Sequence, residues 1–232
     1  MDISTSTALV TGANRGLGAR FAAELVARGA KVYAAARKPE AIELPGVIPV
    51  ALDITDPASV QAAVEATGDV NLLINNAGSS TRSPLLTGDP ADIRLEMETH
   101  YFGTLWASRG FVPQIEARGG GTILNVLSVL SWVAFPTSGA YSAAKAAEWQ
   151  LSNALRVELA PKKIRVASLH VGYMDTDMTS TVTDPKHDPL DIARLALDAV
   201  AADEYEIVAD ELSRRVKAGL AGGIDGLYPQ LP

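Results

Sequence analysis

The sequence of 232 residues contains no cysteine and only three histidines, His100, His170 and His187. The lack of cysteine excludes disulfides and thiolate metal ligands. No two of the histidines are close in the chain, so we expect no metal site. Aromatic residues make up only 6% of the chain, whereas 47% of it is hydrophobic. We therefore expect a large aliphatic core, which favours close-packed helices and buried strands over an aromatic-rich sandwich.

The chain also lacks the basic charge of nucleic-acid-binding proteins and the long apolar runs of membrane proteins. Its formal net charge is −7, from 20 basic and 27 acidic residues, whereas a nucleic-acid-binding face needs an excess of basic groups. No stretch of about 18 residues is continuously apolar, as a membrane-spanning helix requires. The first residues, MDISTSTALVTG, have no basic segment followed by an apolar run, which a secretory signal would have. We therefore expect a cytoplasmic protein that binds neither nucleic acid nor membrane.

Short apolar runs of strand length alternate with helical patterns along the chain. The runs expected as strands are Thr7–Val10, Lys31–Ala35, Val47–Leu52, Val70–Asn75, Gly121–Leu127 and Ile164–Leu169, with Glu206–Val208 as a weaker seventh. The stretches expected as helices are Gly16–Arg28, Pro57–Ala66, Pro90–Glu116, Tyr141–Leu159 and Asp191–Ala202, followed by a polar tail over Asp210–Leu220. Nearly continuous apolar strands are covered on both faces, and their alternation with helices is typical of βαβ units. The sequence therefore predicts an α/β fold in which 1–232 form a single Rossmann-type, doubly wound, mostly parallel seven-stranded sheet with helices on both faces.

The segment after the first expected strand has the composition of a phosphate-binding turn. It reads TGANRGLG over residues 11–18 and leads into an expected helix. Glycines permit a tight turn whose backbone N–H groups approach a pyrophosphate, and the helix N-terminus adds partial positive charge. The cofactor-binding residues expected in this turn are Gly12, Asn14, Arg15, Gly16, Leu17 and Gly18.

The residues after the second expected strand indicate which dinucleotide binds. An NAD site usually has Asp or Glu there, to accept a hydrogen bond from the ribose 2′-hydroxyl. This chain has Ala36, Arg37 and Lys38 instead. No carboxylate would repel a 2′-phosphate, and Arg37 could pair with it through two hydrogen bonds, with Arg15 approaching the same phosphate. The sequence therefore predicts NADP(H) as the cofactor.

The third and fourth expected strands end in residues suited to the rest of a dinucleotide. Asp53 could accept a hydrogen bond from the adenine amino group, with Ile54 against the ring, or it could simply cap the helix that begins near Pro57. The fourth strand leads into Asn75, Asn76, Ala77 and Gly78. Its small residues would let a cofactor lie against the backbone, while the paired amides could instead tie neighbouring strands together.

Three polar residues follow the fifth expected strand. Ser128 ends the strand, with Ser131 as a competitor for any role, and Tyr141 and Lys145 lie four residues apart among alanines. On a helix this spacing places the phenol and the ammonium on one face. A phenol with an ordinary pKa near 10 is a poor base at neutral pH, whereas a neighbouring ammonium stabilises the phenolate. The pair is suited to acid–base chemistry.

Together these motifs resemble those of the short-chain dehydrogenase/reductase family, in its main Tyr-x-x-x-Lys subfamily. The matching pieces are the glycine turn at 11–18, Asn-Asn-Ala-Gly at 75–78, Ser128, and Tyr141 with Lys145, and the resemblance covers residues 7 to about 178. It implies that Tyr141 is the general acid or base and that Ser128 positions a substrate carbonyl. It implies that Lys145 supports Tyr141 and bonds the nicotinamide ribose, so that both residues also line the cofactor site.

The chain departs from the family pattern at two places. His100 stands where the family usually has an Asn that holds a water beside the active-site lysine, in a proton relay. The imidazole could take part in that relay, or it could be a satisfied helix residue. After the sixth strand Val171 replaces the usual Pro, while Gly172 is retained. The resemblance implies that Gly172, Met174 and Thr176 still contact the nicotinamide carboxamide.

The substrate is expected over the nicotinamide, between residues 131–135 and a loop at about 173–190. Trp132, Phe135 and Tyr173 suggest an apolar pocket, although they and His170 could equally pack on the core. No basic residue stands out as a carboxylate clamp, which favours a neutral ketone or aldehyde. The resemblance also implies a homodimer or homotetramer, formed through the helices Pro90–Glu116 and Tyr141–Leu159.

The leading hypothesis is an NADPH-dependent reductase that converts a neutral ketone or aldehyde to an alcohol. One alternative on the same fold is an alcohol dehydrogenase that works in the oxidative direction. The other is a non-catalytic NADP(H)-binding sensor or signalling protein, which the presence of Ser128, Tyr141 and Lys145 argues against.

Overall fold

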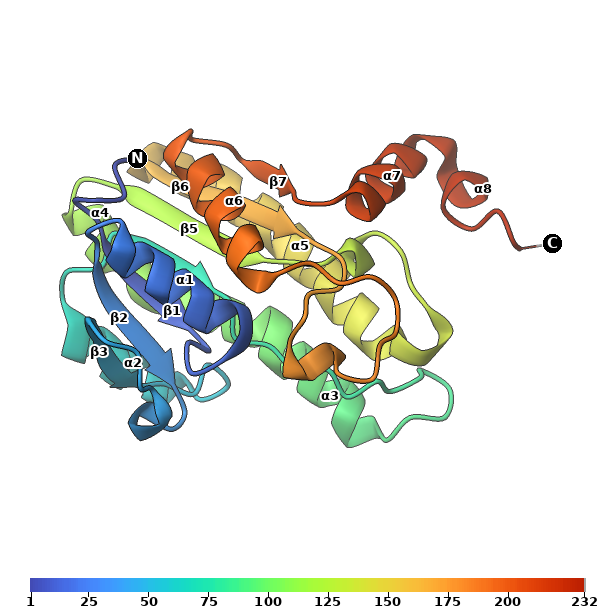
Figure 1. The fold of residues 1–232 in the computed structure, drawn as a ribbon, viewed down its shortest axis with the longest axis horizontal. Helices are drawn as coiled ribbons and strands as arrows, with labels where there is room; N and C mark the ends of the chain where they lie inside the picture. Colours follow the sequence, from blue (N-terminus) through green and yellow to red (C-terminus); the bar gives the residue numbers. More distant parts are fainter. Residues whose placement is uncertain (232) are drawn as a thin grey trace.

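Seven parallel strands form the centre of the computed structural model, which describes residues 1–231 (Figure 1). The strands are β1 (Thr7–Thr11), β2 (Lys31–Ala36), β3 (Val47–Ala51), β4 (Leu72–Asn75), β5 (Gly121–Val126), β6 (Ile164–His170) and β7 (Glu206–Val208). They lie in the order β3-β2-β1-β4-β5-β6-β7, and every neighbouring pair is parallel. The predicted Rossmann-type sheet is confirmed, and the strand bounds differ from the predicted ones by at most two residues.

Helices cover both faces of the sheet. They are α1 (Gly16–Ala27), α2 (Pro57–Thr67), α3 (Pro90–Met97), α4 (Thr104–Ala117), α5 (Gly139–Leu159), α6 (Pro189–Ala201), α7 (Glu211–Gly219) and α8 (Gly223–Leu227). Residues of α1 and α6 belong to one buried apolar cluster, and residues of α2, α4 and α5 belong to a second. Successive strand residues point to opposite faces, so Val10 packs in the first cluster and Leu9 in the second.

Three of the helices begin at an Asp-Pro pair. In α2, α3 and α6 the first residue is proline, and the preceding Asp56, Asp89 and Asp188 accept a hydrogen bond from a backbone N–H two residues on. Proline suits this position because its fixed φ matches the helix and its missing N–H is not needed there, while aspartate caps the exposed donors. Asp56 therefore caps α2, and the proposal that Asp53 does so was wrong.

The long helix predicted over Pro90–Glu116 is not continuous. A π-helical segment, Glu98–Gly103, joins α3 to α4 and carries His100. A π turn holds about one residue more than an α turn, so it changes the phase of the helix without changing its apolar composition. The hydrophobic pattern could not reveal it for that reason.

The end of the chain is helical rather than the simple polar tail that was expected. Helices α7 and α8 form an arm that projects from the sheet and its covering helices (Figure 1). The arm is attached to the rest of the protein by several contacts: the backbone N–H of Ala134 donates to the Tyr228 hydroxyl at 2.9 Å, and Val216 and Tyr228 pack against the cluster of Val129, Leu130 and Val133. None of the helices formed by residues 1–231 is both long and apolar enough to cross a membrane.

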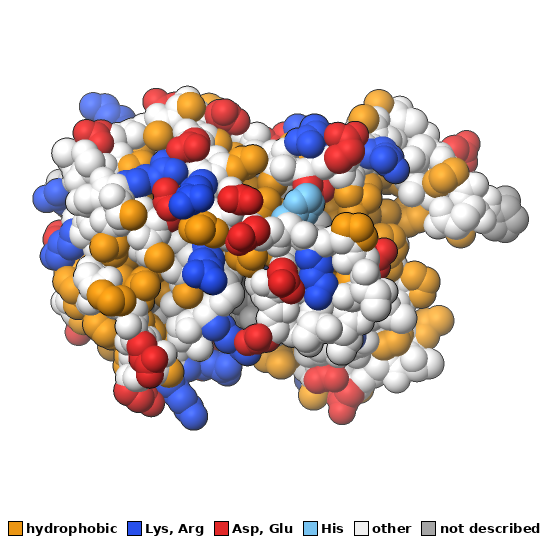
Figure 2. Space-filling model, viewed as in Figure 1, with side chains coloured by type: hydrophobic (Ala, Val, Ile, Leu, Met, Phe, Trp, Pro, Cys, Tyr) orange, Lys and Arg blue, Asp and Glu red, His pale blue; other side chains and the backbone are white. Residues whose placement is uncertain are grey.

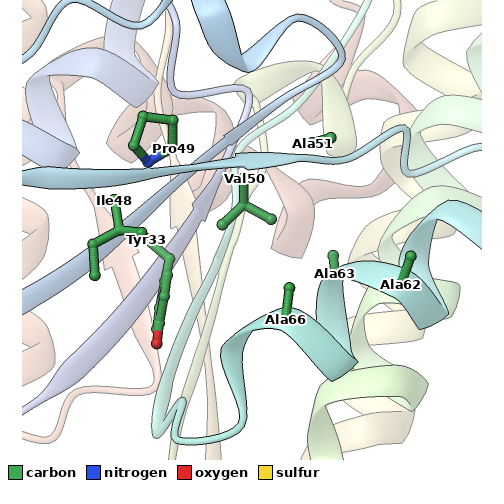
Figure 3. A pocket seen from close by; sticks show the side chains of 8 residues that line it. All are labelled: Tyr33, Ile48, Pro49, Val50, Ala51, Ala62, Ala63 and Ala66. Carbon is green, nitrogen blue, oxygen red and sulfur yellow. The ribbon is translucent and has the colours of Figure 1, made fainter.

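The surface carries acidic and basic side chains side by side. Figure 2 shows both signs mixed over the face that Figure 1 presents, rather than a broad patch of one sign. A shallow apolar groove of about 340 Å³ lies between β2, β3 and α2, lined by Tyr33, Ile48, Pro49, Val50, Ala51, Ala62, Ala63 and Ala66 (Figure 3). This groove contains none of the residues predicted to bind cofactor or substrate.

The strand order reverses between β1 and β4, because the chain adds β2 and β3 on one side of β1 and the remaining strands on the other. In such sheets ligands bind beyond the carboxyl ends of the strands at this reversal. The start of α1 lies close to both strand ends there. A Cβ on Gly18 would lie 2.3 Å from the Gly12 carbonyl oxygen and 2.5 Å from the Asn76 side-chain nitrogen.

Replacing Gly18 with alanine should destabilise the protein by about 1–3 kcal/mol, the usual range for overpacking. The new methyl would collide with backbone at the Gly12 turn, which cannot yield as a flexible side chain would. Gly222 is the matched control, because a Cβ there has no neighbour within 4 Å. Urea unfolding should show a clear loss of stability for G18A and almost none for G222A; equal stabilities would contradict the close approach described here.

Candidate active site

The carboxyl ends of β1 and β4 are tied together by the amide that follows β4. The Asn76 side chain donates to the Thr11 carbonyl oxygen at 2.9 Å, and the Thr11 hydroxyl accepts from the backbone N–H groups of Asn76 and Ala77, each at 2.9 Å. Asn75 performs the same task on the other side, where it donates to Asn125 of β5 at 2.8 Å. The paired amides thus link strand ends, one of the two roles considered for them.

The glycine turn presents backbone rather than side chains. Gly12 and Gly16 have φ values of +66° and +56°, which only glycine adopts readily. No side chain within residues 1–231 caps the start of α1, so the first N–H groups of the helix are free to bind an anion. Asn14 and Arg15 are exposed beside them, whereas Leu17 is buried in the core.

The loop after β6 lies over this turn. Arg15 forms an exposed ion pair with Asp177 at 3.1 Å, and a Cβ on Gly16 would lie 3.5 Å from a methyl carbon of Thr176. The base of the loop is closed by two backbone hydrogen bonds, from Asp175 to His187 at 2.9 Å and from His187 to Tyr173 at 2.8 Å. Met174 pairs with His187 at the same place.

The residues predicted to contact the adenosine end lie at the ends of β2 and β3. Arg37 is exposed directly after β2. Asp53 accepts hydrogen bonds from the Thr55 N–H at 3.0 Å and the Thr55 hydroxyl at 2.7 Å, both at the same oxygen. Its other oxygen therefore remains available as an acceptor. Ile54 is buried and packs against Gly103 of the π segment.

Ser128 and Ser131 belong to one short turn at the end of β5. The Ser131 hydroxyl accepts from the Ser128 N–H at 3.3 Å, and the Ser128 hydroxyl accepts from the Leu130 N–H at 3.1 Å. Ser131 therefore caps the backbone N–H of Ser128 at the start of this turn. Ser128 keeps the proton of its hydroxyl as a donor.

Tyr141 and Lys145 lie on one face of α5, as their spacing predicts. The Lys145 ammonium is 5.9 Å from the centre of the Tyr141 ring, and it donates to the Val126 carbonyl oxygen at 2.7 Å. Helix α5 thereby brings both side chains to the carboxyl end of β5, where Ser128 lies.

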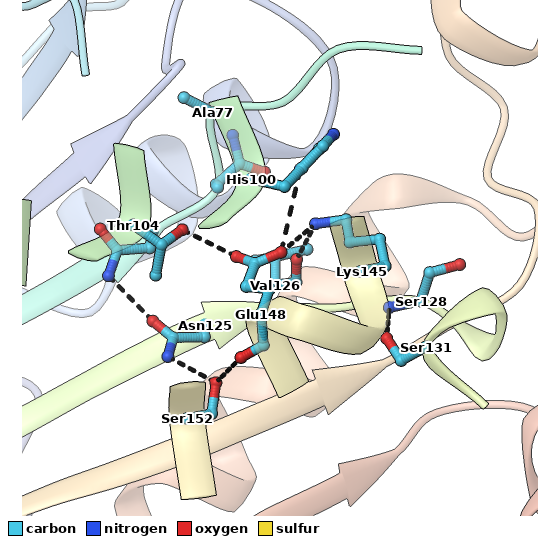
Figure 4. A network of polar contacts seen from close by, with 12 residues as sticks. Ala77, His100, Thr104, Asn125, Val126, Ser128, Ser131, Lys145, Glu148 and Ser152 are labelled. Atoms are coloured by element: carbon cyan, nitrogen blue, oxygen red, sulfur yellow. Dashed lines mark hydrogen bonds and ion pairs between the residues drawn. The ribbon is translucent and has the colours of Figure 1, made fainter. Parts of the chain in front are cut away.

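Two buried carboxylates that sequence reasoning missed complete this cluster, and Figure 4 shows one of them, Glu148. Glu148 accepts from the Lys145 ammonium at 2.7 Å and from the Thr104 hydroxyl at 2.8 Å. Glu96 accepts from the Ser79 hydroxyl at 2.9 Å and from the Thr81 N–H at 2.5 Å. Their spacing was the available signal, because Glu148 follows Lys145 by three residues and Glu96 precedes His100 by four, both contact distances on a helix.

His100 lies between these acids. Its Nε2 is 3.2 Å from Glu96 Oε2 and 3.0 Å from the Ser79 carbonyl oxygen, and its ring meets the Tyr141 ring edge-on with centroids 5.1 Å apart. A Cβ on Gly78 would lie 2.8 Å from the imidazole. The histidine is thus held by buried partners beside Tyr141.

Burial raises the pKa of Tyr141. The Glu148 and Glu96 carboxylates raise it further, while the Lys145 ammonium and the Ser128 hydroxyl act in the opposite direction. Burial also opposes the charge on Lys145, but Glu148, together with Tyr141 and Glu96, outweighs it and the pKa of Lys145 is raised. Lys145 therefore lowers the pKa of Tyr141 as expected, but burial, aided by the two carboxylates, outweighs it, and the net pKa is raised.

The residues expected around the substrate fall into two groups. Phe135 is exposed at the end of the segment after β5, and Tyr173 is half-buried at the start of the loop. Trp132 instead is buried and stacks on His170, with ring centroids 3.8 Å apart, and His170 is fully buried. These two rings pack on one another, which is the alternative left open for them.

Asp210 anchors the segment after β6 and was not expected to have a role. Its carboxylate is buried and accepts from the Gly172 N–H at 2.6 Å and from the Ser213 N–H at 2.7 Å. It joins the start of the loop at Gly172 to α7. In the part of the chain that the structure describes, no three His, Asp or Glu side chains are grouped to hold a metal ion.

The chain is similar to short chain dehydrogenases in sequence. The model of the short chain dehydrogenase family matches residues 6–187. Carbonyl reductase (NADPH) 2 of Sus scrofa is 35% identical over 198 residues, covering 80% of this chain and 79% of that protein. The NADPH-dependent 1-acyldihydroxyacetone phosphate reductase of Schizosaccharomyces pombe is 34% identical over 181 residues, which are 74% of this chain and only 61% of that relative.

The similarity extends to the whole structure. A crystal structure of a short chain dehydrogenase from Burkholderia cenocepacia in complex with NADP has 40% sequence identity and a TM-score of 0.95, and the match covers 100% of both chains. A short-chain dehydrogenase from Streptomyces avermitilis has 27% identity and a TM-score of 0.84 over 97% of this chain and 96% of that one.

The free energy of unfolding should fall as the pH decreases from about 6.5 to about 4, and His170 should cause part of this loss. Burial lowers the pKa of His170 from 6.5 to about 4, so in this window the unfolded chain takes up a proton that the folded protein excludes. The stabilisation is complete above pH 6.5 and amounts to about 3 kcal/mol at most. Denaturant unfolding at several pH values should show a smaller loss for H170F, whereas a variant at the exposed His187, H187N, should behave like the wild type. An unchanged pH dependence in H170F would contradict this assignment.

Proposed function

The chain belongs to the short-chain dehydrogenase family, and we propose that it is an NADP(H)-dependent reductase that converts a neutral ketone or aldehyde to an alcohol. The observation that carries this proposal is the convergence of Ser128, Tyr141 and Lys145 at the carboxyl end of β5, beside the glycine turn. A hydroxyl, a phenol and a buried ammonium at a ligand-binding sheet edge are suited to proton transfer. The carbonyl reductase of Sus scrofa, named for its use of NADPH, supports the same activity.

The residues at the sheet edge fit a dinucleotide. The uncapped N-terminus of α1 and the bare backbone at Gly12 and Gly16 would hold a pyrophosphate. The free oxygen of Asp53 would accept from the adenine amino group, with Asn76, Ala77 and Gly78 along the floor. Gly172, Met174 and Thr176 would lie at the nicotinamide end. When bound, NADPH would supply the hydride that the carbonyl carbon takes up.

Arg37 is proposed to select NADP(H) over NAD(H). Arg37 is exposed directly after β2, where a 2′-phosphate would lie. The preceding residue is Ala36, so no carboxylate stands there to repel the phosphate. Arg15 now pairs with the exposed Asp177. Because such exposed pairs contribute little free energy, Arg15 could turn to the same phosphate at small cost. The NADP complex of the Burkholderia cenocepacia protein supports this choice of cofactor.

The chain's own groups would carry the proton. As the carbonyl carbon gains a hydride, its oxygen becomes an alkoxide, and the Tyr141 hydroxyl would give its proton to that oxygen. The Ser128 hydroxyl would hold the oxygen in place by a hydrogen bond. Lys145 has one N–H left after its bonds to Val126 and Glu148, which would bond the ribose beside Tyr141. Alcohol oxidation is the reverse of the same steps and needs Tyr141 as a phenolate.

The proposed substrate is a neutral carbonyl compound with an aromatic or alicyclic group. Phe135 and Tyr173 would face it, while Trp132 would support the pocket from behind through its stack with His170. A dehydrogenase of trans-4-hydroxycyclohexanecarboxylate from Sinomonas cyclohexanicum, 35% identical over 77% of this chain, supports a ring-sized substrate. We further propose that 1–232 act as one dinucleotide-binding domain in a cytoplasmic homodimer or homotetramer, paired through α5 and the helical stretch from α3 to α4.

Replacing Tyr141 with phenylalanine should abolish turnover. NADPH oxidation, followed at 340 nm with a panel of neutral ketones and aldehydes, should fall by a factor of about 100 to 10,000, the usual contribution of a positioned proton donor. NADPH binding should persist, because the phenol is not a phosphate contact. Tyr205→Phe is the control, since Tyr205 is exposed near β7. Equal turnover in Y141F and the wild type would exclude Tyr141 as the proton donor.

Replacing Arg37 with alanine should raise the KM for NADPH by about 10- to 100-fold, corresponding to the loss of about 1.5–3 kcal/mol from a charge-assisted hydrogen bond. The KM for NADH should change far less, because NADH has no 2′-phosphate. Steady-state kinetics with both cofactors measures this difference directly. An equal change in the two KM values would rule out recognition of the 2′-phosphate by Arg37.

A further inference from the structure

Lys145 shares its buried position with a carboxylate that the proposed proton transfer does not use. The ammonium donates to Glu148 Oε2 at 2.7 Å, and the exposed fractions of the two residues are 5% and 2%. Burying a charged pair costs free energy that well-packed apolar side chains would not. We therefore expect the Glu148 carboxylate to have a role besides packing in the interior near Tyr141.

A second acid and an imidazole extend the pair into a cluster of charges. Glu96 and His100 are 0% and 1% exposed, and His100 Nε2 is 3.2 Å from Glu96 Oε2. His100 Nδ1 lies 3.8 Å from Glu148 Oε2, and within residues 1–231 it has no hydrogen-bond partner. Two buried carboxylates, one ammonium and one imidazole thus lie in a single cluster.

The cluster is built from three elements, and two of its members, His100 and Lys145, lie beside the Tyr141 ring. Lys145 and Glu148 lie on α5 with Tyr141. Glu148 follows Tyr141 by seven positions, about two helical turns, so the side chains of Tyr141 and Glu148 lie on the same face of the helix. Glu96 comes from α3 and His100 from the π segment. Figure 4 shows Glu148 between Thr104, His100 and Lys145. The positive charge of Lys145 near the Tyr141 ring is therefore paired directly with the Glu148 carboxylate.

We propose that Glu148 is a positioning residue that keeps Tyr141 protonated. By pairing with Lys145 and placing a negative charge near the phenol, it extends the range over which the site is a proton donor further into alkaline pH. The phenolate that alcohol oxidation requires then forms only at higher pH. This inference rests on the proposed role of Tyr141 as the proton donor and assigns the favoured reaction at neutral pH to the reductive direction.

The direct readout is the titration of Tyr141 itself, which needs no substrate. Phenolate formation is followed by absorbance near 295 nm, and subtraction of the Y141F titration isolates Tyr141 from the other tyrosines. In E148Q, corrected by E148Q/Y141F, the midpoint should lie about one pH unit or more below the wild-type midpoint, as expected for the loss of one buried charge nearby. A midpoint equal to or above that of the wild type would overturn the proposal.

Two further variants separate charge from structure. E148D keeps the carboxylate and should restore a midpoint near that of the wild type. T104V removes only a hydrogen bond to Glu148 Oε1, and it should leave the midpoint unchanged if charge is the cause; a shift as large as that in E148Q would contradict the proposal. Should E148Q fold poorly, the comparison is repeated without the imidazole, and the midpoint in H100N/E148Q must then lie below that in H100N by a similar amount.

The pH profile of alcohol oxidation with NADP⁺ then distinguishes this inference from the proposed function. In E148Q the alkaline rise of kcat/KM should move to lower pH by the same amount as the Tyr141 midpoint, while the reductive reaction at neutral pH, where Tyr141 stays protonated in both proteins, should change little. A profile that stays in place while the midpoint moves would overturn the link to direction. Absence of turnover in both directions would count against the proposed function, and the titration would still decide the role of Glu148.

Discussion

The buried ammonium of Lys145 is the constraint on which the candidate site depends. A charge without water must be paired and hydrogen-bonded, and Lys145 finds its acceptors in Val126 at the end of β5 and in Glu148 on its own helix. The helix must therefore lie close against the end of β5. Ser152 holds it there, because its hydroxyl accepts from Asn125 of β5 and donates to the Glu148 carbonyl oxygen, each at 2.8 Å. The same packing brings Tyr141 beside Ser128.

Polar side chains at the strand ends extend this arrangement across the sheet. Asn125 accepts from Asn75 at 2.8 Å, so β4, β5 and α5 are joined through one chain of amides and a hydroxyl. Buried polar groups of this kind stabilise a fold only when each finds a partner. They occur where the parallel strands stop, which is also where a ligand binds. The carboxyl ends of the strands thus carry two kinds of residue: those that link the strand ends and those suited to chemistry.

The sequence was sufficient to predict the sheet. Buried parallel strands appear in it as nearly continuous apolar runs, whereas helices appear as apolar residues repeated every three or four positions. The sequence was also sufficient to predict that the glycine turn, Ser128, Tyr141 and Lys145 belong to one site. The glycine turn and Ser128 each follow a strand, and Tyr141 and Lys145 share a helix face. The sequence could not predict the π segment, whose extra residue leaves no compositional mark, or the burial of Trp132 against His170. Glu148 and Glu96 were missed because an acid three or four residues from a basic side chain usually marks an exposed helix face, and only packing shows that this face is inside.

The central claim is that this site transfers a hydride to a carbonyl carbon while Tyr141 supplies the proton. The most direct measurement uses NADPH that carries deuterium at the transferable position of C4, incubated with the panel of neutral ketones and aldehydes. Mass spectrometry of the products should find one deuterium on the carbinol carbon of the alcohol formed, and at least about 100-fold less of this alcohol with Y141F in the same time. Tight NADPH binding without deuterated alcohol from any member of the panel would contradict the account.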